Sequence, residues 1–293
     1  MKILVFGASG HVGMAIVKAL KDGGYTFGAV VRSASKAHAL AAYTNDVRVA
    51  EVTQAESIKG LCAGYEVLIS ALGKSVSPFD KSKATFHEVD YLGNLTILEE
   101  AKRSGIKKFI YISAFHAERY THLEYFRVHH AFGQALMASG LEYTIVKPPA
   151  VFSAYQDMVT MAKKGQLVNI GAGDKKTNPI FEGDLAKVVV EAIKSKVGTI
   201  EAGGKKLYTR RQLNELVQQR FRPNTSLKQI PQWLFKSMLP ILRVFNKNQY
   251  HKFAFFLEVL QEDTIAPQVG NTTFEEYLQI LQPKEQELPS QVL

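Results

Sequence analysis

Three glycines close to the first residue stand at a spacing that suits dinucleotide binding. Gly7, Gly10 and Gly13 follow an apolar run at residues 3–6 and precede a helical pattern. An apolar run without alternation is typical of a buried parallel strand. After such a strand, the first glycine allows a tight turn, the second lets the backbone approach a pyrophosphate, and the third lets helix and strand pack closely. The N–H groups of the first helical turn would bind the phosphates. The residues expected at the pyrophosphate are Gly7, Ser9, Gly10, His11, Val12 and Gly13.

A second motif follows the next expected strand, residues 27–31. There Arg32 is followed by Ser33 and Lys36. An acidic residue at this strand end would accept hydrogen bonds from the ribose 2′-hydroxyl of NAD, whereas a guanidinium binds a 2′-phosphate bidentately. The alternative interpretation is that Arg32 and Lys36 lie in a solvated loop. The motif favours NADP(H) as the cofactor, with NAD(H) as the alternative.

Strand and helix patterns alternate through the first half of the chain. Strands are expected at 3–6, 27–31, 47–50, 67–72, 109–112 and 143–146, and helices at about 55–62, 84–103 and 125–139. This alternation predicts an α/β fold with a Rossmann-type, doubly wound parallel sheet. In such sheets ligands bind beyond the carboxyl ends of the strands. The residues expected to meet there in one cleft are Gly7, Arg32, Val52, Leu72, Ser113 and Pro148.

The pattern loosens after residue 150. We therefore expect an NAD(P)-binding Rossmann domain at 1–150 and a smaller, mostly helical substrate or lid region at 151–293, interleaved with the main domain. Within the second region, 198–208 is expected to form a strand pair and 211–220 a helix.

Residues 227–260 combine large apolar with basic side chains, and they are expected to be helical with a kink or break at Pro240. One interpretation is that these helices cover the substrate cleft or pack against the main domain. It is favoured, because apolar residues at helical spacing are usually buried. The other is an amphipathic surface helix that touches a membrane or a partner.

Composition excludes several classes of protein. The chain has 293 residues, 46% hydrophobic and 22% charged, as in ordinary globular proteins. Its net charge of +9 suits anionic ligands, but no basic run is interleaved with aromatic residues, so nucleic-acid binding is not expected. The single cysteine, Cys62, is expected to be buried, which leaves no disulfide framework, and no metal site is expected. We expect a cytoplasmic protein, because neither a signal peptide nor a run of ~20 apolar residues is present.

Five short motifs occur in a recognisable order, at residues 7–13, 89–94, 107–114, 139–148 and 179–186. With them the chain resembles the atypical and extended short-chain dehydrogenase/reductases, particularly the NmrA-like and isoflavone-reductase-like branch, over about residues 1–192. The resemblance implies a catalytic tyrosine with a lysine four positions later, and a serine that positions the substrate carbonyl.

Here Tyr125 matches the tyrosine, and His129 stands where the lysine is expected. A tyrosine has a reference pKa near ~10 and needs a nearby cation to act at neutral pH, whereas histidine, near ~6.5, is mostly neutral there. The resemblance implies that Tyr125 donates a proton, with His129 binding the ribose or relaying a proton. Ser113 is the available serine, and His116 is a further donor. Both histidines could instead be structural.

The resemblance also implies further cofactor contacts. Val52 would lie beside the adenine, and Pro148 and Pro149 would border the nicotinamide. Lys147 takes a place usually held by arginine. The remaining implied contacts are Ala71, Leu72 and Gly73 along the nucleotide, Asn94 supporting the site, and Ser113 and His129.

Three functions are compatible with these features. The first is an NADP(H)-dependent oxidoreductase that transfers a hydride to a small carbonyl, enone or quinone substrate. The second is an NADP(H)-sensing regulatory protein without turnover, which the missing lysine favours. The third is a sugar-nucleotide epimerase or dehydratase, against which both Arg32 and His129 count, because these enzymes usually hold NAD(H) and keep the lysine.

Overall fold

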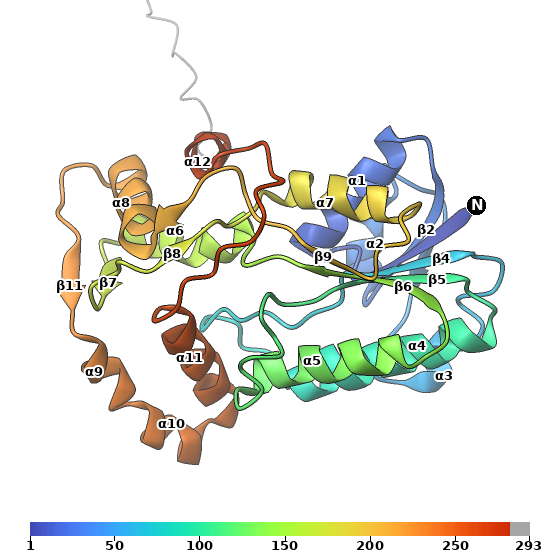
Figure 1. The fold of residues 1–293 in the computed structure, drawn as a ribbon, viewed down its shortest axis with the longest axis horizontal. Helices are drawn as coiled ribbons and strands as arrows, with labels where there is room; N and C mark the ends of the chain where they lie inside the picture. Colours follow the sequence, from blue (N-terminus) through green and yellow to red (C-terminus); the bar gives the residue numbers. More distant parts are fainter. Residues whose placement is uncertain (282–293) are drawn as a thin grey trace, which may run out of the picture.

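The computed structural model describes residues 1–281, and a seven-stranded parallel sheet forms its centre (Figure 1). The strands lie in the order β3-β2-β1-β4-β5-β6-β9, and every pairing between them is parallel. Their bounds are β1 Lys2–Phe6, β2 Thr26–Val31, β3 Val47–Val49, β4 Val67–Ser70, β5 Lys108–Ile112, β6 Glu142–Lys147 and β9 Thr199–Glu201. This topology confirms the predicted Rossmann-type sheet.

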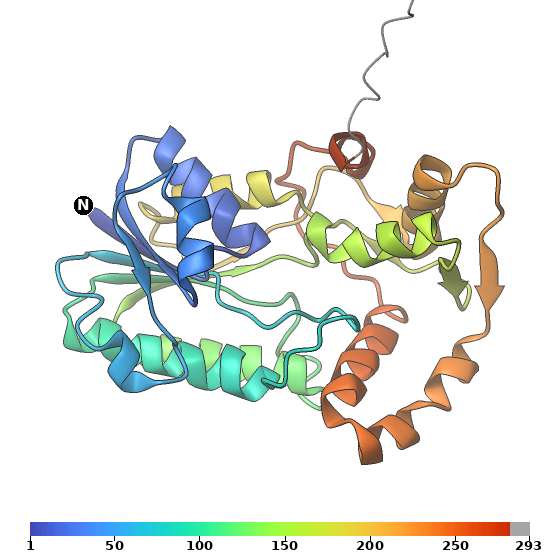
Figure 2. The same cartoon turned by 180° about the vertical axis from the view of Figure 1, so that it is seen from behind.

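Helices cover both faces of this sheet (Figures 1 and 2). One face carries α1 (His11–Asp22), α2 (Ala34–Leu40) and α7 (Glu182–Ala192). The other carries α3 (Ala55–Ile58), α4 (Asn94–Arg103) and α5 (Glu124–Met137). Side chains alternate along a strand, so Ile3 and Val5 join the core under α1 and α7, while Leu4 and Phe6 join the core under α4 and α5. Burial on both sides explains why the strand is apolar without interruption.

The long helix expected at 84–103 has two parts. A π-helical segment, η1 (His87–Gly93), leads directly into α4. Segments of this kind are rare and often occur at functional sites. Cys62 is buried as expected, and its burial raises the pKa of the thiol to about 12.

The chain beyond residue 150 contributes to two cores. α7 and β9 return to the main sheet, while Phe152, Tyr208 and Phe274 lie in a separate apolar cluster. The elements outside the main sheet are η2 Phe152–Tyr155, α6 Gln156–Lys163, β7 Val168–Ile170, β8 Lys176–Thr177, β10 Tyr208–Thr209, α8 Arg210–Phe221, β11 Lys228–Ile230 and α12 Phe274–Leu281. The expected strand pair at 198–208 was wrong, because β9 pairs with β6 and β10 pairs with β8.

The segment 227–260 divides into an exposed part and a packed part. α9 (Gln232–Lys236) and α10 (Leu239–Phe245) contain no buried residue. α11 (Lys247–Val259) buries Ala254 and Leu257 and packs against α5. Pro240 lies in the first turn of α10, where proline is tolerated, and so marks the break between α9 and α10. The favoured interpretation of burial therefore holds for α11 and was wrong for α9 and α10.

Gly13 and Gly133 offer a matched pair of substitutions that tests the packing of α1 on β1. At Gly13 a Cβ would lie 2.1 Å from the carbonyl oxygen of Gly7. We expect Gly13→Ala to lower the free energy of unfolding by about 1–3 kcal/mol, the usual cost of overpacking. At Gly133 in α5 the nearest atom would be 3.5 Å away, so Gly133→Ala should gain up to about 1 kcal/mol from helix propensity. Chemical denaturation measures both effects, and equal effects would contradict this packing.

Candidate functional site

The glycine turn between β1 and α1 brings backbone segments unusually close. Gly7 has a φ of 70°, and a Cβ there would lie 2.5 Å from the carbonyl oxygen of Ala71. Only glycine fits such a position. At Gly10, by contrast, a Cβ would meet a single atom within 4 Å, the carbonyl oxygen of Gly7 at 3.4 Å. The outer side of the turn is therefore free for a ligand to approach the backbone.

The start of α1 has the features of a phosphate site. Gly10 is the N-cap and offers no side chain to the first N–H groups of the helix. Those groups have no acceptor within the helix itself. The first turn also contains no acidic residue. The expected pyrophosphate residues thus fit a dinucleotide, whose phosphates would receive hydrogen bonds from the N–H groups of this turn.

Arg32 follows the end of β2, next to this turn. β1 and β2 are adjacent, with Phe6 opposite Val30, so Gly7 and Arg32 follow neighbouring strand ends. The side chain of Arg32 is exposed, and within residues 1–281 it forms no hydrogen bond or ion pair. Its guanidinium is therefore free to bind an anion.

The two other residues predicted at the 2′-phosphate lie immediately after Arg32. Ser33 is the N-cap of α2, with its hydroxyl 3.0 Å from that of Ser35. Lys36 is exposed in the first turns of that helix. Lys36 lies on a helix, but its exposed side chain, like that of Arg32, is compatible with both the phosphate contact and the solvated alternative.

Further predicted cofactor residues lie together at the ends of β3 and β4. A Cβ on Gly93 would come within 3.2 Å of the Leu72 side chain and 3.3 Å of the Val52 side chain. Both side chains are partly buried, and Gly73 next to Leu72 is exposed. The structure therefore brings Val52 and Leu72 side by side at the carboxyl edge of the sheet.

Asn94 supports this edge from inside the protein. Its side chain is fully buried and accepts a hydrogen bond from the Ser70 hydroxyl at 2.6 Å. It donates a second to the backbone oxygen of Asp90 at 2.9 Å. This arrangement fits the expected supporting role of Asn94, which holds the end of β4 through atoms that are engaged within the protein.

The ends of β5 and β6 lie against each other. The N–H of Ser113 donates to the carbonyl oxygen of Val146 at 2.8 Å, and that of Phe115 donates to Pro148 at 3.3 Å. Ser113 and Pro148 are buried and Pro149 is partly exposed. The structure therefore brings Ser113 close to Pro148 and Pro149, the two residues predicted to border the nicotinamide.

His116 and Lys147 lie near this junction. His116 has a φ of 56°, a backbone conformation that residues other than glycine rarely adopt. Its ring stacks on Phe115 at 3.7 Å. Partial burial and the charge of Arg119 lower the pKa of His116, so its ring is neutral at neutral pH. Lys147 donates to the Glu118 carboxylate at 3.0 Å, which already engages its ammonium group.

Tyr125 lies in the first turn of α5 among aromatic rings. Its ring centroid is 4.4 Å from that of Phe255 in α11, 4.6 Å from His129 and 5.5 Å from Phe86. Burial raises the pKa of Tyr125, and the neighbouring Asp90 raises it further. No cation within residues 1–281 offsets this effect. The phenol is therefore protonated at neutral pH and is a weaker acid than a tyrosine beside a lysine.

His129 is held between two buried groups that the sequence prediction missed. Its Nδ1 lies 2.6 Å from the Tyr111 hydroxyl, and its Nε2 lies 3.4 Å from Oδ1 of Asp90. Burial lowers the pKa of His129 to about 4 and raises that of Asp90 to about 8. Because both ring nitrogens face protein groups, the expected ribose contact of His129 is replaced by a structural network. A usable signal existed, since Asp90 stands four positions before Asn94 and so lies on the same helical face.

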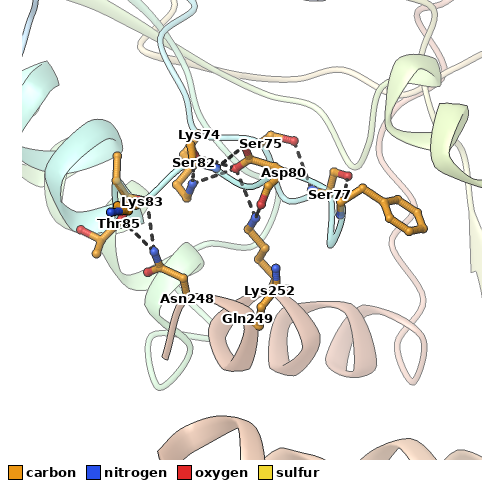
Figure 3. Close-up of polar contacts among 12 residues, drawn as sticks. Lys74, Ser75, Ser77, Asp80, Ser82, Lys83, Thr85, Asn248, Gln249 and Lys252 are labelled. Atoms are coloured by element: carbon orange, nitrogen blue, oxygen red, sulfur yellow. Dashed lines mark hydrogen bonds and ion pairs between the residues drawn. The ribbon is translucent and has the colours of Figure 1, made fainter. Parts of the chain in front are cut away.

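The loop after β4 is fastened to α11 by a second polar cluster (Figure 3). The Lys74 ammonium donates to Asp80 at 2.8 Å, and that of Lys252 reaches the same carboxylate oxygen at 3.2 Å. Although partial burial opposes the change, hydrogen bonds from Lys74, Ser82 and Lys252 lower the pKa of Asp80. Asn248 adds a hydrogen bond to the backbone oxygen of Lys83 at 2.9 Å. This cluster holds α11, and with it Phe255, against the site.

Comparisons with known proteins agree with this geometry. A family pattern described as NAD(P)H-binding matches residues 7–196. The photosystem II assembly factor Ycf39 of Guillardia theta is 30% identical over 69% of this chain and 63% of the relative. The match therefore spans less than two thirds of that relative's length.

Two solved structures have the same fold. One is a triphenylmethane reductase of Citrobacter sp. complexed with NADP(H), which is 17% identical with a TM-score of 0.71, covering 96% of this chain and 100% of that one. The other is a nucleoside-diphosphate-sugar epimerase of Staphylococcus aureus, also 17% identical with a TM-score of 0.71, covering 95% and 100%. At this identity the likeness shows a shared fold.

The buried Asp90 gives stability a dependence on pH. Its folded pKa of about 8 exceeds the unfolded value of 3.8, so the folded state keeps a proton that the unfolded state loses, and stability falls as pH rises toward 8. Below pH 6.5, unfolded His129 binds a proton that buried His129 does not, and the two effects oppose each other. Of these two effects on the free energy of unfolding, the Asp90 effect is the one that acts between pH 6.5 and 8.

In that window the wild-type protein should lose on the order of 1–2 kcal/mol of unfolding free energy. Asp90→Asn should lose much less, because it cannot ionise and keeps an oxygen acceptor for the Lys74 N–H. Asp46→Asn is the control, since hydrogen bonds hold the pKa of Asp46 at about 2 against the effect of its burial. Denaturant titrations across the window measure the slopes. A wild-type slope that persists in Asp90→Asn would refute the assignment.

Proposed function

This chain belongs to the NAD(P)H-binding family, and on that premise we propose that it is an NADP(H)-dependent reductase of small molecules. The observation that carries the proposal is the exposed, unengaged guanidinium of Arg32, which follows the strand end adjacent to the glycine turn. A cation in this place favours a 2′-phosphate and therefore NADPH over NADH.

The chain's own residues would bind different parts of the cofactor at the carboxyl ends of β1 to β6. The first turn of α1 would bind the pyrophosphate, and Arg32, with Lys36 nearby, would bind the 2′-phosphate. Val52 and Leu72 would contact the adenosine part, while Ser113 and Pro148 would border the nicotinamide. When bound, NADPH supplies the hydride, and the protein supplies position and electrostatics.

Tyr125 would act as the hydrogen-bond donor to the substrate oxygen. Its raised pKa keeps the phenol protonated, but it also makes proton transfer to the substrate less favourable. Reduction of a quinone leaves a phenolate-type oxygen with a conjugate-acid pKa near ~10, like tyrosine itself, whereas a simple ketone yields a far more basic alkoxide. The environment of Tyr125 therefore favours quinone or enone acceptors. Phe255 would provide an apolar wall for such a planar substrate, while Phe86 is buried against Tyr125.

A second candidate is an NADP(H)-binding regulatory protein without turnover. The observation that favours it is the buried, neutral His129, whose Nδ1 lies 2.6 Å from the Tyr111 hydroxyl, so that Tyr125 has no cationic helper. The likeness to a protein named as an assembly factor points the same way. An epimerase or dehydratase is less well supported, since Arg32 favours NADP(H) and His129 replaces the lysine.

Arg32→Asp tests the cofactor assignment. Charge-assisted hydrogen bonds contribute about 1.5–3 kcal/mol, so NADPH binding should weaken roughly ten- to hundredfold while NADH binding changes little. Lys164→Asp reverses an exposed charge at the end of α6 and serves as the control. Titration calorimetry with both cofactors gives the comparison. An equal loss for NADPH and NADH would rule out a 2′-phosphate contact by Arg32.

Tyr125→Phe tests the reaction. Removing a donor that stabilises a developing oxyanion costs on the order of a hundredfold in turnover, and NADPH affinity should stay near the wild-type value. The measurement is NADPH oxidation with a panel of quinones, enones and ketones. Full activity of Tyr125→Phe would remove this residue from the mechanism. Tight NADPH binding without turnover on any acceptor would support the regulatory candidate instead.

A further inference from the structure

A row of exposed apolar side chains covers α9 and α10, which lie at the outer edge of the molecule, away from the main sheet (Figures 1 and 2). Positions 234, 238, 241 and 245 follow helical spacing, and Ser237 and Met238 between the helices keep helical dihedrals. We call this row the α9–α10 surface. Its members and their exposed fractions are Trp233 67%, Leu234 45%, Met238 43%, Ile241 61%, Val244 75% and Phe245 84%.

The stretch of sequence that contains this surface is strongly basic. Between residues 215 and 258 the sequence contains no Asp or Glu. The same stretch contains seven of the chain's cations, which are Arg220, Arg222, Lys228, Lys236, Arg243, Lys247 and Lys252. Lys252 is buried against Asp80, and the other six are exposed. Since the net charge of the chain is +9, this stretch accounts for most of the excess.

We propose that the α9–α10 surface docks on an anionic lipid bilayer. Exposed apolar side chains beside cations, without acids, are the pattern of helices that lie in the membrane interface. No helix within residues 1–281 is long and apolar enough to cross a bilayer, so the contact is peripheral. A second copy of the chain fits less well, because a symmetric contact would bring the same cations together.

The neighbouring helix α11 connects this surface to the rest of the molecule. α10 continues into α11, which is fastened to the loop after β4 through Lys252 and Asp80. α11 also contacts Tyr125 through Phe255. Helix α11 would therefore lie between a bilayer bound at α9 and α10 and Tyr125 of the proposed reductase site. Docking itself does not depend on the proposed activity.

The chain carries its own probe for this contact. Trp233 is its single tryptophan, and it belongs to the α9–α10 surface. The experiment adds vesicles of phosphatidylcholine alone, or of phosphatidylcholine mixed with phosphatidylglycerol in equal amounts, to the full chain. With the anionic vesicles we expect a blue shift of Trp233 emission and co-flotation, both reduced by added salt. Neutral vesicles should bind much more weakly.

Variants separate specific docking from general attraction of a basic protein. Lys236→Glu with Arg243→Glu should weaken binding to anionic vesicles by at least roughly twentyfold, since each cation near such a surface contributes about fivefold. Ile241→Ser with Phe245→Ser should abolish the blue shift. The matched control is Lys196→Glu with Val197→Ser, an exposed cation and an exposed apolar residue before β9. All these side chains are exposed, so thermal unfolding should confirm that each variant folds.

Three results would overturn the proposal. One is the absence of binding to anionic vesicles. Another is binding without a change in Trp233 emission, which would place the contact elsewhere. The third is Trp233 emission that shifts with protein concentration in the absence of lipid, which would assign the surface to a second copy of the chain.

Discussion

The close approach of backbone at the β1–α1 turn is the constraint on which the rest of the structure depends. Gly7 lies against Ala71 at the end of β4, and Gly13 lies against Gly7 itself, so a side chain at either position would separate α1, β1 and β4. Because these segments touch directly, the N–H groups of α1 face the carboxyl edge of the sheet. The same edge receives Arg32 from β2, Leu72 from β4 and the Ser113–Pro148 junction. The glycine contacts thus position α1, β1 and β4, and parallel strand pairing brings the other predicted residues to the same edge.

Burial is the largest cause of the pKa shifts of Asp90, Tyr125 and His129. In this chain the place of the family's lysine is taken by a neutral histidine, and the groups around it form a closed network. The Asp90 carboxyl accepts from the backbone N–H of Lys74, His129 is paired with the Tyr111 hydroxyl, and burial favours the uncharged form of both Asp90 and His129. Tyr125 beside them thus has no cation to lower its pKa. In the proposed reductase this environment would favour quinone or enone acceptors, whose reduced oxygen is less basic than the alkoxide of a simple ketone.

The parts of this protein that could be predicted from the sequence are those encoded in local pattern. The strand, glycine turn and helix at the start of the chain, and the position of Arg32 after β2, depend on neighbouring residues alone. The network of Asp90, Tyr111 and His129 could not be predicted, because it requires that η1, β5 and α5 bring particular faces together. The pairing of β9 with β6 is equally long-range. Apolar spacing predicted helices at α9 and α10, but spacing does not reveal whether the chain supplies a partner to cover them.

Hydride transfer to an acceptor is the central claim, and single-turnover kinetics test it most directly. NADPH and NADPH deuterated at the transferred position would each be bound to the protein and mixed rapidly with a quinone, with NADPH absorbance followed in time. If the protein is a reductase, bound NADPH is oxidised and deuterium slows the reaction. Bound NADPH that persists unchanged in the presence of every quinone would contradict this claim.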